Sequence, residues 1–126
     1  MTESMETLVT SRLENVAEAR AFIADTLRRW HLDHLVRPVV LIGHELMANA
    51  LCHGDPPVHL RLLLQDGTVV VEVTDAGARM PRIVEIDNSM STSGRGLRII
   101  ATLASRWGVR RHEVGKTVWA EIPTAE

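Results

Sequence analysis

The spacing of apolar positions predicts three amphipathic helices. The first is expected in residues 15–30. The second is expected to begin at Pro38, because proline suits the first helical turn, and to end at Gly54. The third resumes after a long glycine- and serine-containing segment and runs toward Ala104. In the first helix, apolar side chains recur every three or four residues with charged residues between them: Val16, Ala19, Ile23, Leu27 and Trp30.

Runs of β-branched and aliphatic residues predict the strands. Residues 58–65 and 68–74 flank Asp66-Gly67, a two-residue turn that suits a tight hairpin. Two more strands are expected near 107–112 and 117–122, around a turn from Glu113 to Lys116, and residues 7–13 form a short edge strand. The order of elements predicts an α+β fold, a two-layer sandwich with helices packed on one face of a mixed, mainly antiparallel sheet.

Residues 75–96 interrupt this pattern with a long loop, in which one short ordered turn is expected around residues 83–86. A loop of that length inside a small domain is usually functional or disordered.

Composition narrows the classes of function. The chain has 126 residues, 45% of them hydrophobic, which predicts one domain over residues 1–126. Its net charge of -2 comes from interspersed charges without a basic stripe, so nucleic acid is not the expected partner. The single Cys52 excludes an internal disulfide, and its apolar surroundings predict a buried thiol. We expect a cytoplasmic protein, because no signal-peptide pattern or membrane span is recognised.

The stretch HELMANALCHG, residues 44–54, places three polar side chains on one stripe of the second helix. Glu45, Asn49 and His53 are each four residues apart, which is the spacing of one helix face; a solvated face is the alternative reading. After the Val-rich strand, Asp75 is followed by Gly77, whose missing side chain lets backbone approach a flat group. A simple turn is the alternative there.

Two further glycine-containing segments complete the candidate site. Residues 93–97, SGRGL, open a helix with two glycines and so offer free backbone N–H groups and the helix dipole to an anion such as a phosphate. The alternative is a loop that only caps the helix. Residues 115–117, GKT, enter the last strand, where an ordinary hairpin turn is the alternative.

Together these four segments resemble the GHKL nucleotide-binding family, whose Bergerat-type fold is shared by gyrase-type, chaperone-type and histidine-kinase ATPases. The resemblance rests on HELMANALCHG as the N box, DAG and GRGL as the two glycine boxes, and GKTVWAEI at the C-terminus, and it covers nearly the whole chain. Within the family the sequence is most similar to small bacterial anti-sigma factor serine kinases and related regulatory ATP-binding proteins. The resemblance implies ATP and Mg²⁺ as cofactors, an anti-anti-sigma-like protein and a sigma factor as partners, and a homodimer.

The resemblance also implies a role for each matching residue. Asn49 would hold the Mg²⁺ that bridges the phosphates, and Glu45 would act as general base. Asp75 would accept a hydrogen bond from the adenine amino group, while Gly77 leaves space for the ring. Residues of the second glycine box and of the last strand would complete the cofactor site: Gly94, Arg95, Gly96 and Leu97 at the phosphates, and Thr117 beside Asp75.

Several functions stay open at this point. The segment between the glycine boxes contains no lysine to reach the γ-phosphate, so a serine kinase competes with a switch that binds nucleotide and partner without transfer. A histidine-kinase catalytic half is disfavoured, because too few residues precede the N box for a dimerisation helix.

The spacing of the histidines shows no set of four ligands for a tetrahedral zinc site. Trp30, Trp107 and Trp119 are interpreted as core packing, and arginines of the first helix as partner contacts: Arg20, Arg28 and Arg29.

Overall fold

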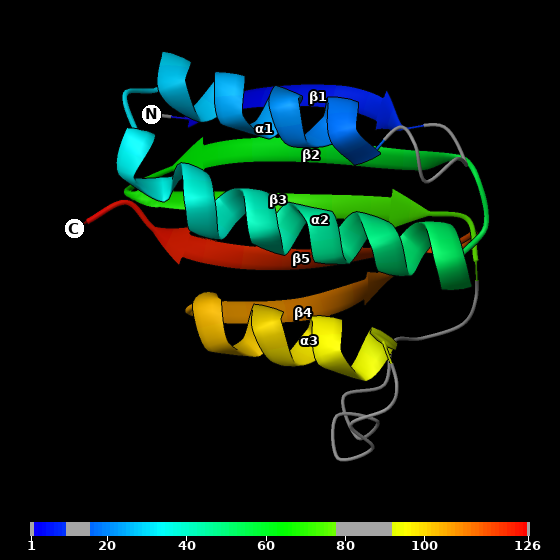
Figure 1. Ribbon diagram of the computed structural model, residues 1–126. Helices are drawn as coiled ribbons and strands as arrows, with labels where there is room; N and C mark the ends of the chain where they lie inside the picture. Colours follow the sequence, from blue (N-terminus) through cyan, green and yellow to red (C-terminus); the bar gives the residue numbers. More distant parts are fainter. Residues whose placement is uncertain (1, 10–15, 78–91, 126) are drawn as a thin grey trace.

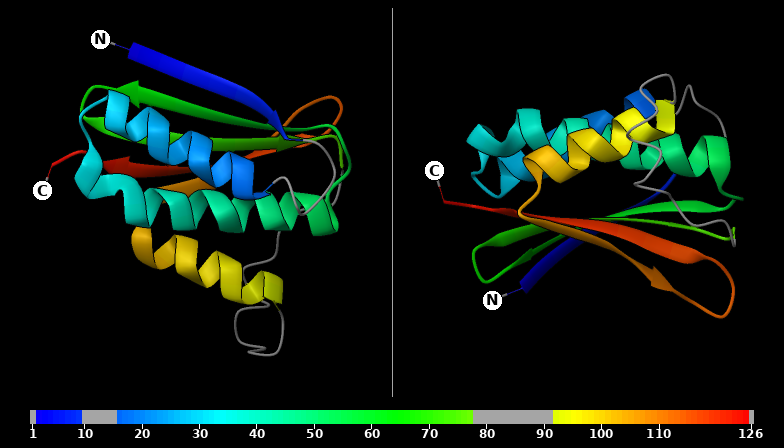
Figure 2. Two further views of the ribbon diagram at one scale, coloured as in Figure 1. Left: turned by 45° about the horizontal axis from the view of Figure 1, so that its top comes forward. Right: turned by 90° about the horizontal axis from the view of Figure 1, so that it is seen from below.

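A computed structural model describes residues 2–9, 16–77 and 92–125 (Figure 1). Its helices lie on one face of a five-stranded sheet of order β1-β2-β3-β5-β4 (Figure 2). All four strand pairings are antiparallel, so the predicted two-layer α+β fold is confirmed with a sheet that is antiparallel throughout its described strands. The elements are β1 (Thr2–Val9), α1 (Val16–Arg29), η2 (Asp33–Leu35), α2 (Val36–His53), β2 (Val58–Gln65), β3 (Thr68–Asp75), α3 (Thr92–Leu103), β4 (Arg106–Arg111) and β5 (Lys116–Pro123).

The core lies between the helices and the sheet. Alternate residues of a strand point to opposite faces, so every second side chain of β2, β3 and β5 is directed at the helices. Helix α2 lies between α1 and α3 (Figure 1) and contributes the central apolar stripe. The largest fully buried side chains come from both layers: Ile23, Leu27, Ile42, Met47, Leu60, Leu62 and Ile100.

The boundaries of α2 differ from the prediction at its start. The helix begins at Val36, two residues before Pro38, which lies in the first turn, where a missing N–H loses no intrahelical bond. At the other end Gly54 follows the last helical residue in an extended conformation, with φ -98° and ψ -169°. The helix therefore ends where the sequence predicted, without the left-handed glycine that often closes helices.

The predicted β2–β3 hairpin is confirmed. Asp66 and Gly67 have φ values of 46° and 79°, the positive pair that a tight two-residue turn requires. The edge strand is confirmed as β1, although it begins at Thr2, and residues 10–13 of the prediction lie outside the described residues. The short turn expected around residues 83–86 also lies outside them.

Three predictions about single side chains need correction. Cys52 is exposed, because it lies two residues beyond the buried Ala50 and therefore about 200° around the helix from it. Lys116 is the first residue of β5 and not part of the preceding turn. The tryptophans are partly buried, and Trp30 and Trp107 pack against the core as expected. Trp119 does not, because it is out of phase with the core residues of β5 and lies on the other face of the sheet, where the Arg106 guanidinium is 5.8 Å from its ring.

The segment Asp33–His53 is long and apolar enough to cross a membrane by length and composition. Its side chains give that composition another explanation, because a stripe along α2 is buried against α1 and the sheet: Val39, Ile42, Leu46, Met47 and Ala50. A helix that supplies the centre of a core needs the same composition.

Candidate functional site

Four segments that are far apart in the sequence converge at one end of the sheet. The C-terminal end of α2, the end of β3, the beginning of α3 and the beginning of β5 lie at this end in all views (Figures 1 and 2). These are the segments that carry the four sequence motifs. The structure therefore brings together the parts of the chain that sequence analysis assigned to one site.

Asp75 provides the buried acid of this site. It ends β3 in phase with Val71 and Val73, so its side chain lies on the helix-facing side of the sheet and is 2% exposed. Its Oδ1 atom accepts the backbone N–H of Gly77 at 2.7 Å and that of Asp55 at 3.4 Å. Two backbone segments thus hold the carboxylate in place.

Lys116 provides a cation that sequence analysis did not assign to the site. Its Nζ donates to Asp75 Oδ1 at 3.0 Å and approaches the carbonyl oxygen of Gly77 at 3.4 Å, and its side chain is 6% exposed. Lys116 lies directly across from Asp75 in the β3–β5 register. The signal was present in the sequence, because Lys116 is in phase with Val118 and Ala120, two core residues of the same strand.

Two glycines allow the backbone to close around the carboxylate. A Cβ atom at Gly54 would lie 2.5 Å from Asp75 Cγ and 2.6 and 2.7 Å from its two oxygens. A Cβ at Gly77 would lie 3.0 Å from Asp75 Oδ1 and 3.1 Å from the backbone nitrogen of Asp55. Sequence analysis interpreted Gly54 as the end of the second helix and of the N box; its further role is to make room for Asp75.

The prediction that Thr117 helps to hold Asp75 is not supported by the structure. Neighbouring residues of a strand face opposite sides, so Lys116 faces Asp75 and Thr117 faces away from it. The Thr117 hydroxyl instead pairs with that of Thr74 at 2.6 Å and with Nε2 of His112 at 2.7 Å. These contacts connect β3, β5 and the β4–β5 turn on the face away from the helices.

Asn49 lies on the flank of α2 that is away from the contact of this helix with α1. Gly43 packs against Ile23 of α1, and Asn49 follows six residues later, about 240° around the helix. That flank is directed toward α3, which adjoins α2 (Figure 1). The side chains of Asn49 and of Glu45, one helical turn earlier, are partly exposed and therefore reachable by a ligand.

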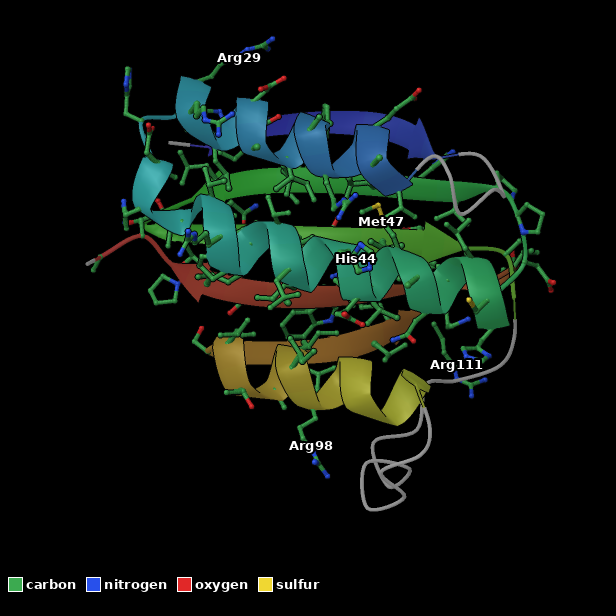
Figure 3. All side chains as sticks on the ribbon, in the orientation of Figure 1. Arg29, His44, Met47, Arg98 and Arg111 are labelled. Atoms are coloured by element: carbon green, nitrogen blue, oxygen red, sulfur yellow. The ribbon has the colours of Figure 1, made fainter. Side chains whose placement is uncertain are left out.

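Glu45 also borders a hollow of about 640 Å³ on the outer side of α1 and α2. Apolar side chains line most of it, and Arg20, Arg37 and His44 add polar groups. Figure 3 shows His44 midway along α2. The hollow gives a molecule outside the domain access to Glu45.

The second glycine box lies at the beginning of α3. The helix begins at Thr92, so Gly94, Arg95 and Gly96 belong to its first turns, as the prediction of a helix opened by these residues requires. The first four N–H groups of a helix have no intrahelical partner, and the helix dipole favours an anion there. The backbone of this segment is suited to phosphate oxygens.

The residues present fit a magnesium nucleotide with a limited protein contribution. Mg²⁺ takes oxygen ligands and usually keeps several waters, binding through one or two protein groups and the phosphates. Asn49 offers one such amide oxygen. Among residues 16–77 and the described part of the C-terminal segment, no group of three or more His, Cys, Asp or Glu side chains could hold a metal ion alone. The ion is therefore expected only together with a nucleotide.

Comparison with known proteins agrees with this geometry. Residues 9–122 match the histidine kinase-like ATPase domain family. Among solved structures, the blue-light activated histidine kinase of Erythrobacter litoralis EL346 is similar, with 25% identity, a TM-score of 0.57, and coverage of 73% of this chain and 31% of that chain. A histidine kinase domain from the same protein has 19% identity, a TM-score of 0.58, and coverage of 89% and 60%. The alignments thus span less than two thirds of each of those chains, and no curated protein matches.

Proposed function

Because the chain belongs to the histidine kinase-like ATPase domain family, we propose that it is an ATP-binding regulatory serine-protein kinase of the anti-sigma factor type. In this proposal it transfers the γ-phosphate of ATP to a serine of an anti-anti-sigma-like partner and sequesters a sigma factor. Family membership supports the coarser part, an ATP-binding regulatory domain. The observation that carries the proposal is the convergence of four motif segments at the end of the sheet where the buried carboxylate of Asp75 lies.

Each part of the site has a distinct task in this proposal. Asp75 accepts a hydrogen bond from the adenine amino group, the N–H groups at the beginning of α3 bind phosphate oxygens, and Asn49 provides an oxygen for Mg²⁺. Mg·ATP supplies the phosphoryl group, and ADP leaves with the electron pair of the broken bond. Glu45 accepts the proton of the attacking serine hydroxyl.

The position of Glu45 supports a protein as phosphoryl acceptor. Its carboxylate borders the open hollow on the outer side of α1 and α2, so a serine on a partner's surface has a route to it. Arg20 lines this hollow, and Arg28 and Arg29 of α1 are also exposed; Figure 3 shows Arg29 at the end of this helix. We further propose that partner contacts involve these arginines, that the chain forms a homodimer and that it works in the cytoplasm.

One observation favours a second function, a switch that binds nucleotide and partner without phosphoryl transfer. Lys116 already occupies Asp75 Oδ1, the acceptor that adenine would use. Weakened or slowed nucleotide binding is tolerable in a switch, whose output is the exchange of partners. It is less favourable in an enzyme that must release ADP and rebind ATP in every cycle.

Glu45→Gln separates the two functions. The substitution preserves shape and removes the base, so a kinase should lose about 10²–10⁴-fold in transfer to anti-anti-sigma-type proteins while its ATP affinity is retained. Glu113→Gln, in the exposed β4–β5 turn, is the matched control and should leave both unchanged. If the wild type binds ATP but never phosphorylates such partners, the kinase proposal is wrong and the switch remains.

A further inference from the structure

Lys116 is the single lysine of the sequence, and it is almost completely buried. The neighbouring position on β4, Arg111, is directly across from it in the register and is exposed. Replacing a buried ion pair by apolar residues of similar volume is often neutral or stabilising. The fold alone therefore does not explain a lysine at this position.

The contacts of Asp75 show what Lys116 does to the site. A carboxylate oxygen has about two lone-pair positions, and Oδ1 already receives the Gly77 N–H, the Lys116 ammonium and a longer contact from Asp55. The second oxygen faces Gly54, where even a Cβ atom would lie only 2.7 Å away. Little of the carboxylate is left for a nucleobase.

Lys116 is the one flexible group among the described contacts of this carboxylate. The groups from Gly54, Asp55 and Gly77 are backbone atoms, which can move only with the chain. A lysine ammonium sits on a flexible four-carbon stem and can swing away without a change of backbone. If a nucleobase is to reach Asp75, Lys116 is therefore the group that must move away.

We propose that Lys116 is a displaceable internal counter-ion of the base subsite, which competes with the adenine amino group for Asp75 and lowers nucleotide affinity. The inference rests on the proposed nucleotide-binding function and adds a residue that sets the affinity of that site. When the ion pair is the dominant state, the apparent affinity is the intrinsic affinity multiplied by the open fraction, which is the fraction of molecules in which Lys116 has moved away. An open fraction of about one tenth corresponds to about tenfold weaker binding.

The test is calorimetry with Mg·ATP on the full chain and on Lys116→Met, which preserves length and removes the ammonium. The expected result is about tenfold tighter ATP binding by the variant. Arg110→Met is the matched control, because it removes a cation from Glu72, another buried carboxylate of β3 on the other face of the sheet. Its ATP affinity should equal that of the wild type, and thermal unfolding shows whether each variant is folded.

A second measurement uses the wild type and does not depend on the folding of a variant. Lysine-selective isotope labelling gives one side-chain spin system, because the sequence has one lysine. On saturation with adenosine or ATP, the Lys116 Cε signals should move toward the values of a solvent-exposed lysine. Unchanged signals while nucleotide binds would overturn the inference, as would equal or weaker binding by a folded Lys116→Met.

The two levels of the proposal fail differently. If neither the wild type nor a folded Lys116→Met binds ATP, the nucleotide-binding function itself is wrong, and the inference with it. If both bind ATP equally well and Lys116 does not move, only the counter-ion role is refuted.

Discussion

Gly54→Ala tests how closely the end of α2 packs against Asp75. An added Cβ would lie 2.5 Å from Cγ and within 2.7 Å of both oxygens, and these three nearest atoms all belong to the Asp75 carboxyl group. Because φ at this position is -98°, alanine can adopt the backbone conformation without strain. Any loss of stability would therefore come from close packing around the added methyl group and not from backbone strain.

The magnitude follows from two opposing effects. Replacing glycine by alanine at a compatible position stabilises by about 0.4–1 kcal/mol, because the unfolded chain loses freedom. Overpacking a well-packed site costs about 1–3 kcal/mol. We expect a net destabilisation of about 1–2 kcal/mol in urea unfolding, together with weaker ATP binding, because the displaced carboxylate no longer meets the base.

Making Gly54→Ala in a variant that lacks the Asp75 carboxylate isolates the contact between the added methyl group and that carboxylate. In Asp75→Ala/Lys116→Met the carboxylate and its counter-ion are both absent, so Gly54→Ala should there stabilise by about 0.4–1 kcal/mol. The difference between the two backgrounds measures the clash. An equal loss of stability in both backgrounds would refute the close packing of Gly54 against Asp75.

Two further predictions concern residues whose placement differs from the sequence-based expectation. Thr117→Val removes the hydroxyl contacts with Thr74 and His112 and should destabilise the fold by about 1–2 kcal/mol in urea unfolding. It should leave the ATP affinity within about twofold of the wild type, since a side chain on the other face does not touch the base subsite; a tenfold loss of affinity in calorimetry would contradict that placement. Native Cys52 should react with iodoacetamide about as fast as a free peptide thiol, because it is exposed, and mass spectrometry can follow the only thiol of the chain. Protection that disappears only on unfolding would show that Cys52 is buried after all.

The fold could be predicted because each element carries its own periodic signal. The α1 stripe from Val16 to Leu27 and the Asp66-Gly67 turn specify a helix and a hairpin without knowledge of the rest of the chain. The start of α2 was predicted two residues too late, since Pro38 is compatible with several positions of a first turn. Cys52 was misassigned because an apolar segment was treated as buried on all sides.

The site could be predicted in its parts and not in its pairings. Asp75 and Gly77 were recognised from a strand end and a nearby glycine, whereas the contact of Gly54 with Asp75 depends on how α2 ends over the sheet. Sequence analysis also named Thr117, instead of Lys116, as the β5 residue beside Asp75. This placement came from the family resemblance, but the register pairs Asp75 with Lys116. In a strand, a shift of one residue moves a side chain to the other face of the sheet.

The central claim is that this end of the sheet binds an adenine nucleotide through Asp75. Calorimetry of the full chain with Mg·ATP and with Mg·GTP, on the wild type and on Asp75→Asn, tests it most directly. The account predicts that the wild type binds ATP in clear preference to GTP and that the substitution removes most of this preference. Absence of ATP binding, or equal binding of both nucleotides by the wild type, would contradict it.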